Sequence, residues 1–83
     1  MGWELSLQML RLIRHRERAH NPRPPKTRDF AQLLELEWSE INQELDGLAN
    51  KGFIELVRSE DQDWTVTNLT MEGMYFLDRT RGL

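Results

Sequence analysis

The fold of this 83-residue chain can be inferred chiefly from residues 27–53, TRDFAQLLELEWSEINQELDGLANKGF. Apolar side chains recur at helical spacing over residues 30–34 and again over residues 41–48. The pattern breaks at residues 35–37, and Gly52 follows the second run as a glycine typically follows a helix. The stretch therefore predicts two helices joined by a three-residue turn.

Capping residues predict where these two helices begin. Thr27 is the predicted N-cap of the first helix, and Asp29 lies in its first turn, where a carboxylate is favourable. The second helix has two possible starts: Glu37 directly follows the turn, whereas Ser39, two residues later, is the better capping residue.

Further elements flank this central stretch on both sides. An amphipathic helix with a basic polar face is predicted for residues 3–19, and the connector 20–26 holds all three prolines, which make it stiff and extended. After the second helix the apolar period changes to two, which predicts a hairpin over residues 53–67 with an acidic tip. Thr70 is the predicted cap of a last helix over residues 70–80.

The order of these elements resembles the winged helix-turn-helix superfamily, and four motifs carry the resemblance. FAQLLEL (30–36) looks like the "ELAERLGL" helix and turn, and INQELDGL (41–48) looks like the "VTRLVDRL" recognition helix. KGFI (51–54) is similar to the "RGLI" that enters the wing, and VTNLTMEGMYFL (66–77) is similar to the "LTxxGxxxL" that ends MarR-like and PadR-like wings. One departure is Glu35, which stands where the family usually has glycine.

The resemblance implies both a fold and a function. The expected fold is a single α+β winged-helix domain over residues 1–83, with a three-helix core that includes the helix-turn-helix 27–51, a two-stranded wing and a C-terminal helix. The expected function is that of a small DNA-binding transcriptional regulator, which places its recognition helix in the major groove of double-stranded DNA. A homodimer is expected because two recognition helices then reach successive grooves.

The same resemblance nominates a contact surface. Leu36 and Ile41 must pack between the two helices, so the second helix projects its opposite face, on which Gln or Asn can bond adenine edges and Ser can reach phosphates. Arg28 and Arg58 are the cations best placed to contact the DNA backbone. The predicted DNA contacts are Thr27, Arg28, Trp38, Ser39, Asn42, Gln43 and Arg58.

Charge is distributed unevenly and argues against this surface. Residues 1–28 contain seven Lys or Arg and two Glu, whereas residues 29–63 contain ten Asp or Glu and only two Lys or Arg. The segments carry +5 and −8 within a formal net charge of −3, and the acid lies on the predicted recognition helix and wing. Phosphate neutralisation by Lys and Arg supplies most non-specific affinity, so DNA binding is expected to be weak, dependent on the basic first helix and connector, or absent.

A second hypothesis therefore stays open, in which the domain is a protein-interaction module. Its acidic helix and wing would dock a basic partner, and Trp38 would anchor the contact. For Trp38 itself, packing into the core is an alternative of equal weight. Trp64 is expected to pack against Phe53 or the recognition helix. Trp3 and the leucines of the first helix are expected mostly in the core, and the apolar surface left on that helix is the candidate dimer surface together with Met71, Met74 and Phe76.

Composition excludes several chemistries. The chain has no cysteine, which rules out disulfides and thiolate metal sites, and His15 and His20 do not share a helix face, so neither a metal nor any other cofactor is expected. No catalytic constellation is present, and the predicted class is non-enzymatic. Apolar runs are only a few residues long, so a cytoplasmic protein without a membrane segment is expected.

Overall fold

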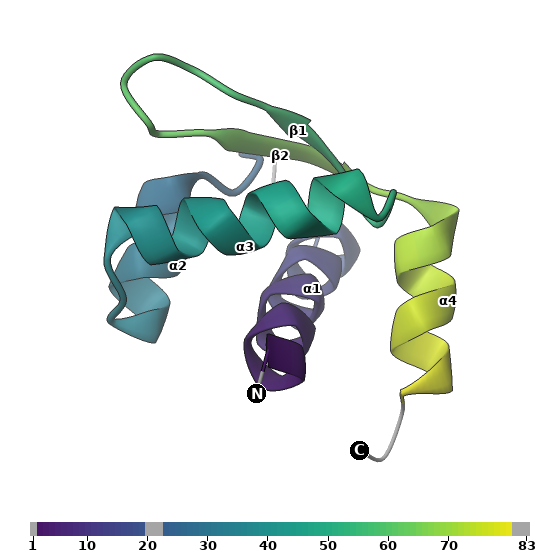
Figure 1. The fold of residues 1–83 in the computed structure, drawn as a ribbon. Coiled ribbons are helices and arrows are strands. Elements are labelled where there is room, and N and C mark those ends of the chain that lie inside the picture. The colour runs from purple at the N-terminus through teal and green to yellow at the C-terminus, as the bar shows by residue number, and fades with distance from the viewer. Residues whose placement is uncertain (1, 20–22, 81–83) are drawn as a thin grey trace.

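The structure is a computed structural model that describes residues 2–19 and 23–80. Over these residues the chain is α+β, with four helices and one two-stranded antiparallel sheet in a winged-helix-like layout (Figure 1). The elements are α1 (Gly2–Arg18), α2 (Thr27–Leu34), α3 (Trp38–Asn50), β1 (Ile54–Val57), β2 (Thr65–Leu69) and α4 (Met71–Arg79). The predicted order and types of the elements are confirmed.

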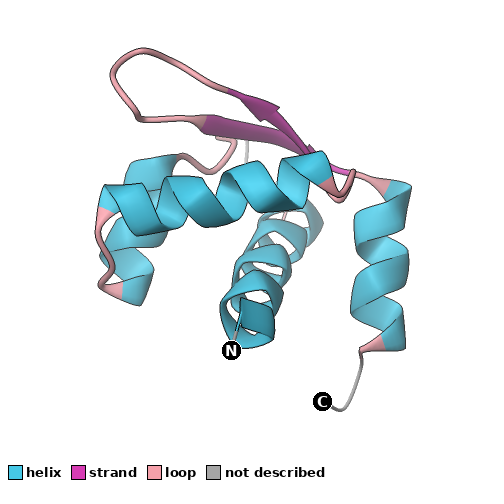
Figure 2. Cartoon of the chain, viewed as in Figure 1, coloured by secondary structure: helices cyan, strands magenta, loops and turns pink. Residues whose placement is uncertain are grey.

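One apolar core joins all the elements. α3 lies across α1 (Figures 1 and 2). α2 is near the first turn of α3, and α4 is near the last turn of α3. The hairpin runs back from the end of α3 toward α2. Each helix turns its apolar stripe inward, and alternate strand residues do the same. The buried apolar side chains are Leu7, Met9, Leu10, Ile13, Phe30, Ile41, Leu45, Leu48, Ile54, Val66, Leu69, Phe76 and Leu77.

The turn between α2 and α3 contains one residue in the left-handed conformation. Glu35 adopts φ 56° and ψ 46°, and its N–H bonds to the carbonyl of Ala31. A non-glycine residue in this region costs about 1 kcal/mol. Glu37 is the N-cap of α3, and the helix begins at Trp38, which decides between the two predicted starts.

The predicted cap of α2 is wrong, and the predicted cap of α4 is confirmed. Lys26 is the N-cap of α2, and its N–H donates to Asp29 Oδ2 at 2.8 Å, whereas Thr27 lies inside the helix and is buried. Asp29 therefore stabilises the first turn, as expected for a carboxylate there. At the other end of the chain, the hydroxyl of Thr70 accepts from the N–H of Gly73 at 3.1 Å.

The hairpin packs closely against α4 where the wing ends. β1 and β2 pair antiparallel with a register shift between Glu55 and Leu56, and β2 continues to Leu69, two residues beyond the predicted end of the wing. A Cβ added to Gly73 would lie 2.3 Å from the carbonyl oxygen of Phe53. Glycine is thus required at position 73, where α4 packs against the backbone of Phe53.

Among the described residues, none of the helices combines the length and the hydrophobicity that a membrane span needs.

Candidate nucleic-acid interface

One face of α3 is turned away from the core. Ser39 and Gln43 are exposed one helical turn apart on this side, and Trp38, which precedes Ser39 at the start of the helix, is 40% exposed. We call these three residues the recognition face. Trp38 lies outside the apolar core cluster, so of its two predicted alternatives the packing into the core is wrong. The face carries a hydroxyl, an amide and an indole, groups that can contact either base edges or a protein.

The neighbouring Asn42 points the other way and is buried, with 6% of its surface exposed. Its Oδ1 accepts from the hydroxyl of Thr27 at 2.6 Å, and its Nδ2 donates to the carbonyl of Gln62 at 2.8 Å. The hydroxyl of Thr27 in turn accepts from the N–H of Trp64 at 2.9 Å. These four residues, which we call the wing junction, connect α2, α3 and the loop between the two strands.

Backbone contacts reinforce the wing junction. The N–H of Thr27 donates to the carbonyl of Trp64, and the N–H of Val66 donates to the carbonyl of Pro25, both at 2.9 Å. Gln62 adopts φ 68°, a conformation that places its carbonyl on Asn42. Buried polar groups linked in this way hold elements in a fixed relative position. The wing is therefore fixed beside the recognition face.

The predicted contact set changes as a consequence. Thr27 is fully buried, and the polar atoms of Asn42 are used inside the fold, so neither side chain lies on the surface that a duplex would meet. The physical reason is their helical position, because both lie in line with buried apolar residues of their own helix. The predicted residues that remain exposed are Arg28, Trp38, Ser39, Gln43 and Arg58.

The two predicted phosphate contacts are paired with carboxylates. Arg28 Nε lies 3.3 Å from Asp63 Oδ2, in the loop between the two strands. Arg58, which directly follows β1, donates to Asp46 Oδ1 of α3 from Nε at 3.1 Å and also from Nη2. The Arg58 guanidinium also lies 5.5 Å from the ring centre of Trp64. DNA would therefore have to compete with internal carboxylates for both cations.

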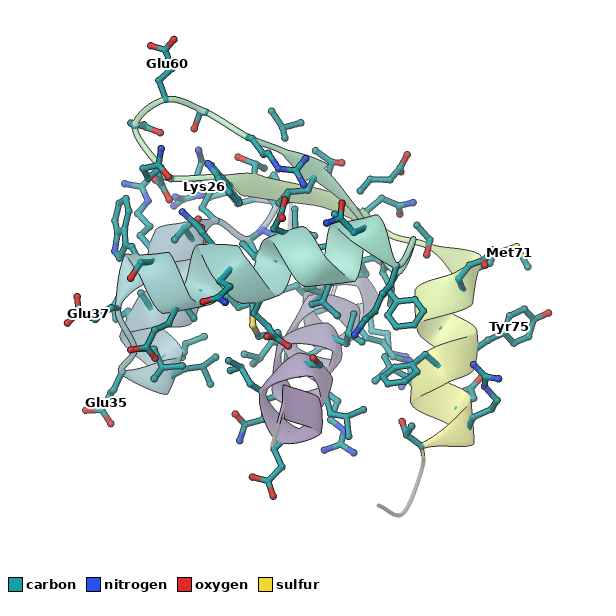
Figure 3. The ribbon with its side chains drawn as sticks, in the orientation of Figure 1. Lys26, Glu35, Glu37, Glu60, Met71 and Tyr75 are labelled. Carbon is teal, nitrogen blue, oxygen red and sulfur yellow. The ribbon has the colours of Figure 1, made fainter. Side chains whose placement is uncertain are left out.

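Acidic side chains are exposed at the start of α3 and at the wing tip. Glu37, the N-cap of α3, and Glu40, in its first turn, are exposed, and Glu60 projects from the wing tip (Figure 3). Glu44 is different: its carboxylate accepts from the hydroxyl of Ser6, which directs it toward α1. At the wing tip, hydrogen bonds from the Ser59 hydroxyl and the Asp63 N–H hold the pKa of Asp61 below its usual 3.8.

The basic face of α1 is partly used within the fold. Arg14 pairs with Asp78 of α4 at 3.4 Å, and Arg16 lies 3.9 Å from Asp29 of α2. Glu17 accepts from the N–H of Leu69 at 3.1 Å and so links α1 to the end of β2. Metal-ligand clusters are absent from residues 2–19 and 23–80; His20 lies outside them.

The aromatic predictions have mixed outcomes. Phe76 is buried and stacks on Phe53 at 4.7 Å between ring centres, so it belongs to the core and not to a dimer surface. Trp64 packs partly buried against the core, and its Nε1 donates to the Ser59 carbonyl at 3.1 Å. Met71 and Met74 are exposed, whereas the Trp3 side chain lies outside the described part of the structure.

Comparison of the chain with protein-family profiles, curated proteins and solved structures finds no significant match.

Proposed function

We propose that this protein is a small DNA-binding transcriptional regulator that acts as a homodimer and inserts α3 into the major groove of double-stranded DNA. One observation carries the proposal: Ser39 and Gln43 are exposed one turn apart on α3, beside a wing that the wing junction fixes in place. Preorganised contact groups lose little entropy on binding. DNA binding is consistent with the cytoplasmic location expected from the sequence and requires no catalytic group.

Each exposed residue has a chemical role in this proposal. The amide of Gln43 can bond both N6 and N7 of adenine, and the hydroxyl of Ser39 can contact a base edge or a phosphate. Arg28 at the start of α2 and Arg58 on the wing contact the backbone on either side of the groove and position α3. Backbone contacts supply affinity, whereas Ser39 and Gln43 supply sequence preference.

The internal ion pairs set the expected strength of binding. Arg28 and Arg58 already interact with Asp63 and Asp46, and the exposed Glu37 and Glu40 repel phosphates. The Arg58–Asp46 pair is exposed on both sides and is worth less than about 1 kcal/mol, so a phosphate can displace Asp46. Asp63 is buried, so it competes more strongly for Arg28. We therefore expect weak binding that depends strongly on salt.

A second candidate function is a protein-interaction module, and the exposure of Trp38 beside acidic residues favours it. A tryptophan that is 40% exposed next to Glu37 and Glu40 offers an anchor with an anionic rim. Such a surface fits a basic partner protein, whose cations would meet the carboxylates that repel DNA.

Fluorescence anisotropy with duplex DNA of random sequence at low and moderate salt separates the two candidates. We expect salt-sensitive binding that the double variant Ser39→Ala with Gln43→Ala weakens. The matched control is Gln8→Ala, which removes an exposed amide from α1. Wild-type protein that does not bind even at about 50 mM salt, where phosphate contacts are strong, contradicts the DNA proposal and favours the protein module.

A further inference from the structure

The outer side of α4 exposes large side chains that the core does not use. Met71 is 65% exposed and Tyr75 is 61% exposed, one helical turn apart. Both side chains point away from the body of the molecule (Figure 3). The opposite side of α4 holds the buried Gly73, Phe76 and Leu77. α4 is therefore amphipathic, but its outward side is not purely polar.

Two opposite charges lie along one edge of this outward side. Glu72 and Arg79 are seven residues apart, which places them two turns apart in nearly the same direction from the helix. Together with Tyr75 and Phe53 they line a hollow on the surface. Neither forms an ion pair with another described residue, whereas Asp78 on the other edge pairs with Arg14. We call Met71, Glu72, Tyr75 and Arg79 the α4 face.

We infer that the α4 face binds the α4 face of a second copy of this chain, with the two helices antiparallel. The inference rests on the proposed function, of which a homodimer is one part, and it names the surface that forms the dimer. This surface is remote from the recognition face, since α4 lies beyond the last turn of α3 and Trp38 lies at its first turn (Figure 1). Both recognition faces would stay open in such a dimer.

The spacing of the charges favours an antiparallel pair. With a two-fold axis perpendicular to the helices, between residues 75 and 76, Glu72 of one copy is level with the partner's Arg79, and the reverse pair forms as well. The two tyrosines at position 75 then lie within about 1.5 Å of the same level, where their rings can stack. A parallel pair would leave Glu72 and the partner's Arg79 roughly 10 Å apart along the axis.

Charge also distinguishes a second copy from other occupants. A symmetric interface places the same patch on both partners, so the patch must be complementary to itself. The α4 face meets this condition because it carries one acid and one base at positions that the two-fold axis exchanges. A partner of uniform charge would instead meet either Glu72 or Arg79 with a like charge.

Charge exchange tests the inference directly. Sedimentation equilibrium without DNA should show a dimer of the wild-type chain, and Glu72→Arg or Arg79→Glu alone should weaken it about tenfold, since each places like charges in both cross-pairs. The double variant with both changes restores opposite charges and should recover wild-type affinity. Glu60→Arg, at the wing tip, is the matched control and should leave dimerisation unchanged.

Several outcomes would overturn the inference. A monomeric wild-type chain, single variants that dimerise like the wild type, or a double variant that stays monomeric while circular dichroism shows it folded each contradict the antiparallel pair. The proposed function fails separately. A monomer whose DNA binding depends on Ser39 and Gln43 refutes this interface alone, whereas a charge-rescued dimer that binds no DNA refutes the DNA proposal alone.

Discussion

Asn42 and Gln43 are adjacent amides on α3, yet they belong to regions with opposite roles. Asn42 is buried in the wing junction, with hydrogen bonds to Thr27 and Gln62, whereas Gln43 is exposed on the recognition face. One step along a helix turns a side chain by about 100°. The direction of a polar residue relative to the apolar stripe, and not its type, therefore decides whether it holds the fold together or is available to a partner.

The largest expected effect is on folding, from Asn42→Ala. The change leaves the buried hydroxyl of Thr27 without its acceptor and the carbonyl of Gln62 without its donor, and should lower the free energy of unfolding by about 3 kcal/mol. Urea denaturation followed by circular dichroism measures it. The matched control Gln43→Ala should change stability by less than about 0.5 kcal/mol. Equal losses of stability in the two variants would show that Asn42 and Gln43 do not differ in their structural roles.

A smaller loss of stability is expected from Thr27→Val, which removes only the hydroxyl at nearly constant volume. Asn42 Oδ1 and the N–H of Trp64 each lose a partner, so unfolding should become easier by about 2 kcal/mol. Thr27→Ser keeps the hydroxyl and should be closer to the wild type in the same urea titration. If the serine variant proved the less stable of the two, the methyl group and not the hydrogen bonds would be what matters at this position.

The exposed cations should affect binding more than folding. Arg28→Ala combined with Arg58→Ala is expected to weaken binding to duplex DNA about tenfold and to flatten its salt dependence, because two phosphate contacts are lost. Anisotropy measured across a series of salt concentrations tests this. Arg11→Ala, an exposed cation on α1, is the control. A larger loss for Arg11→Ala would place DNA on the basic first helix instead.

The smallest expected effect concerns the wing tip. Hydrogen bonds from Ser59 and the Asp63 N–H lower the pKa of Asp61 below 3.8 in the folded protein. A lowered folded pKa means that this contribution to stability is present above pH 3.8 and is lost as the pH falls through the folded pKa. Titration followed by NMR should show this pKa, and Ser59→Ala should raise it toward 3.8. A pKa that does not respond to the substitution would remove Ser59 as its cause.

Much of the fold could be predicted because local signals agreed with one another. The broken apolar period at residues 35–37, the change of period after Gly52 and the Thr70 cap each mark the end or start of an element that the structure contains. The cap of α2 could not be predicted in the same way. Thr27 has the right chemistry, but the structure uses its hydroxyl in a long-range bond to Asn42.

The candidate site was less predictable, because it depends on which polar groups meet across the fold. Asn42 lies three residues before the buried Leu45 and seven before the partly buried Ala49, a spacing that could have placed it beside the apolar stripe. The pairing of Arg58 with Asp46 joins residues on different elements, and no local pattern indicates it. Sequence reasoning could therefore nominate polar residues, but not separate internal partners from exposed ones.

NMR chemical-shift mapping can measure whether the recognition face is available for DNA while the wing junction serves the fold. We expect titration with duplex DNA to shift the signals of Ser39, Gln43, Arg28 and Arg58, and to leave the side-chain amide of Asn42 bonded and protected from solvent exchange. Shifts confined to α1, or an Asn42 amide that exchanges as fast as that of Gln43, would contradict the account.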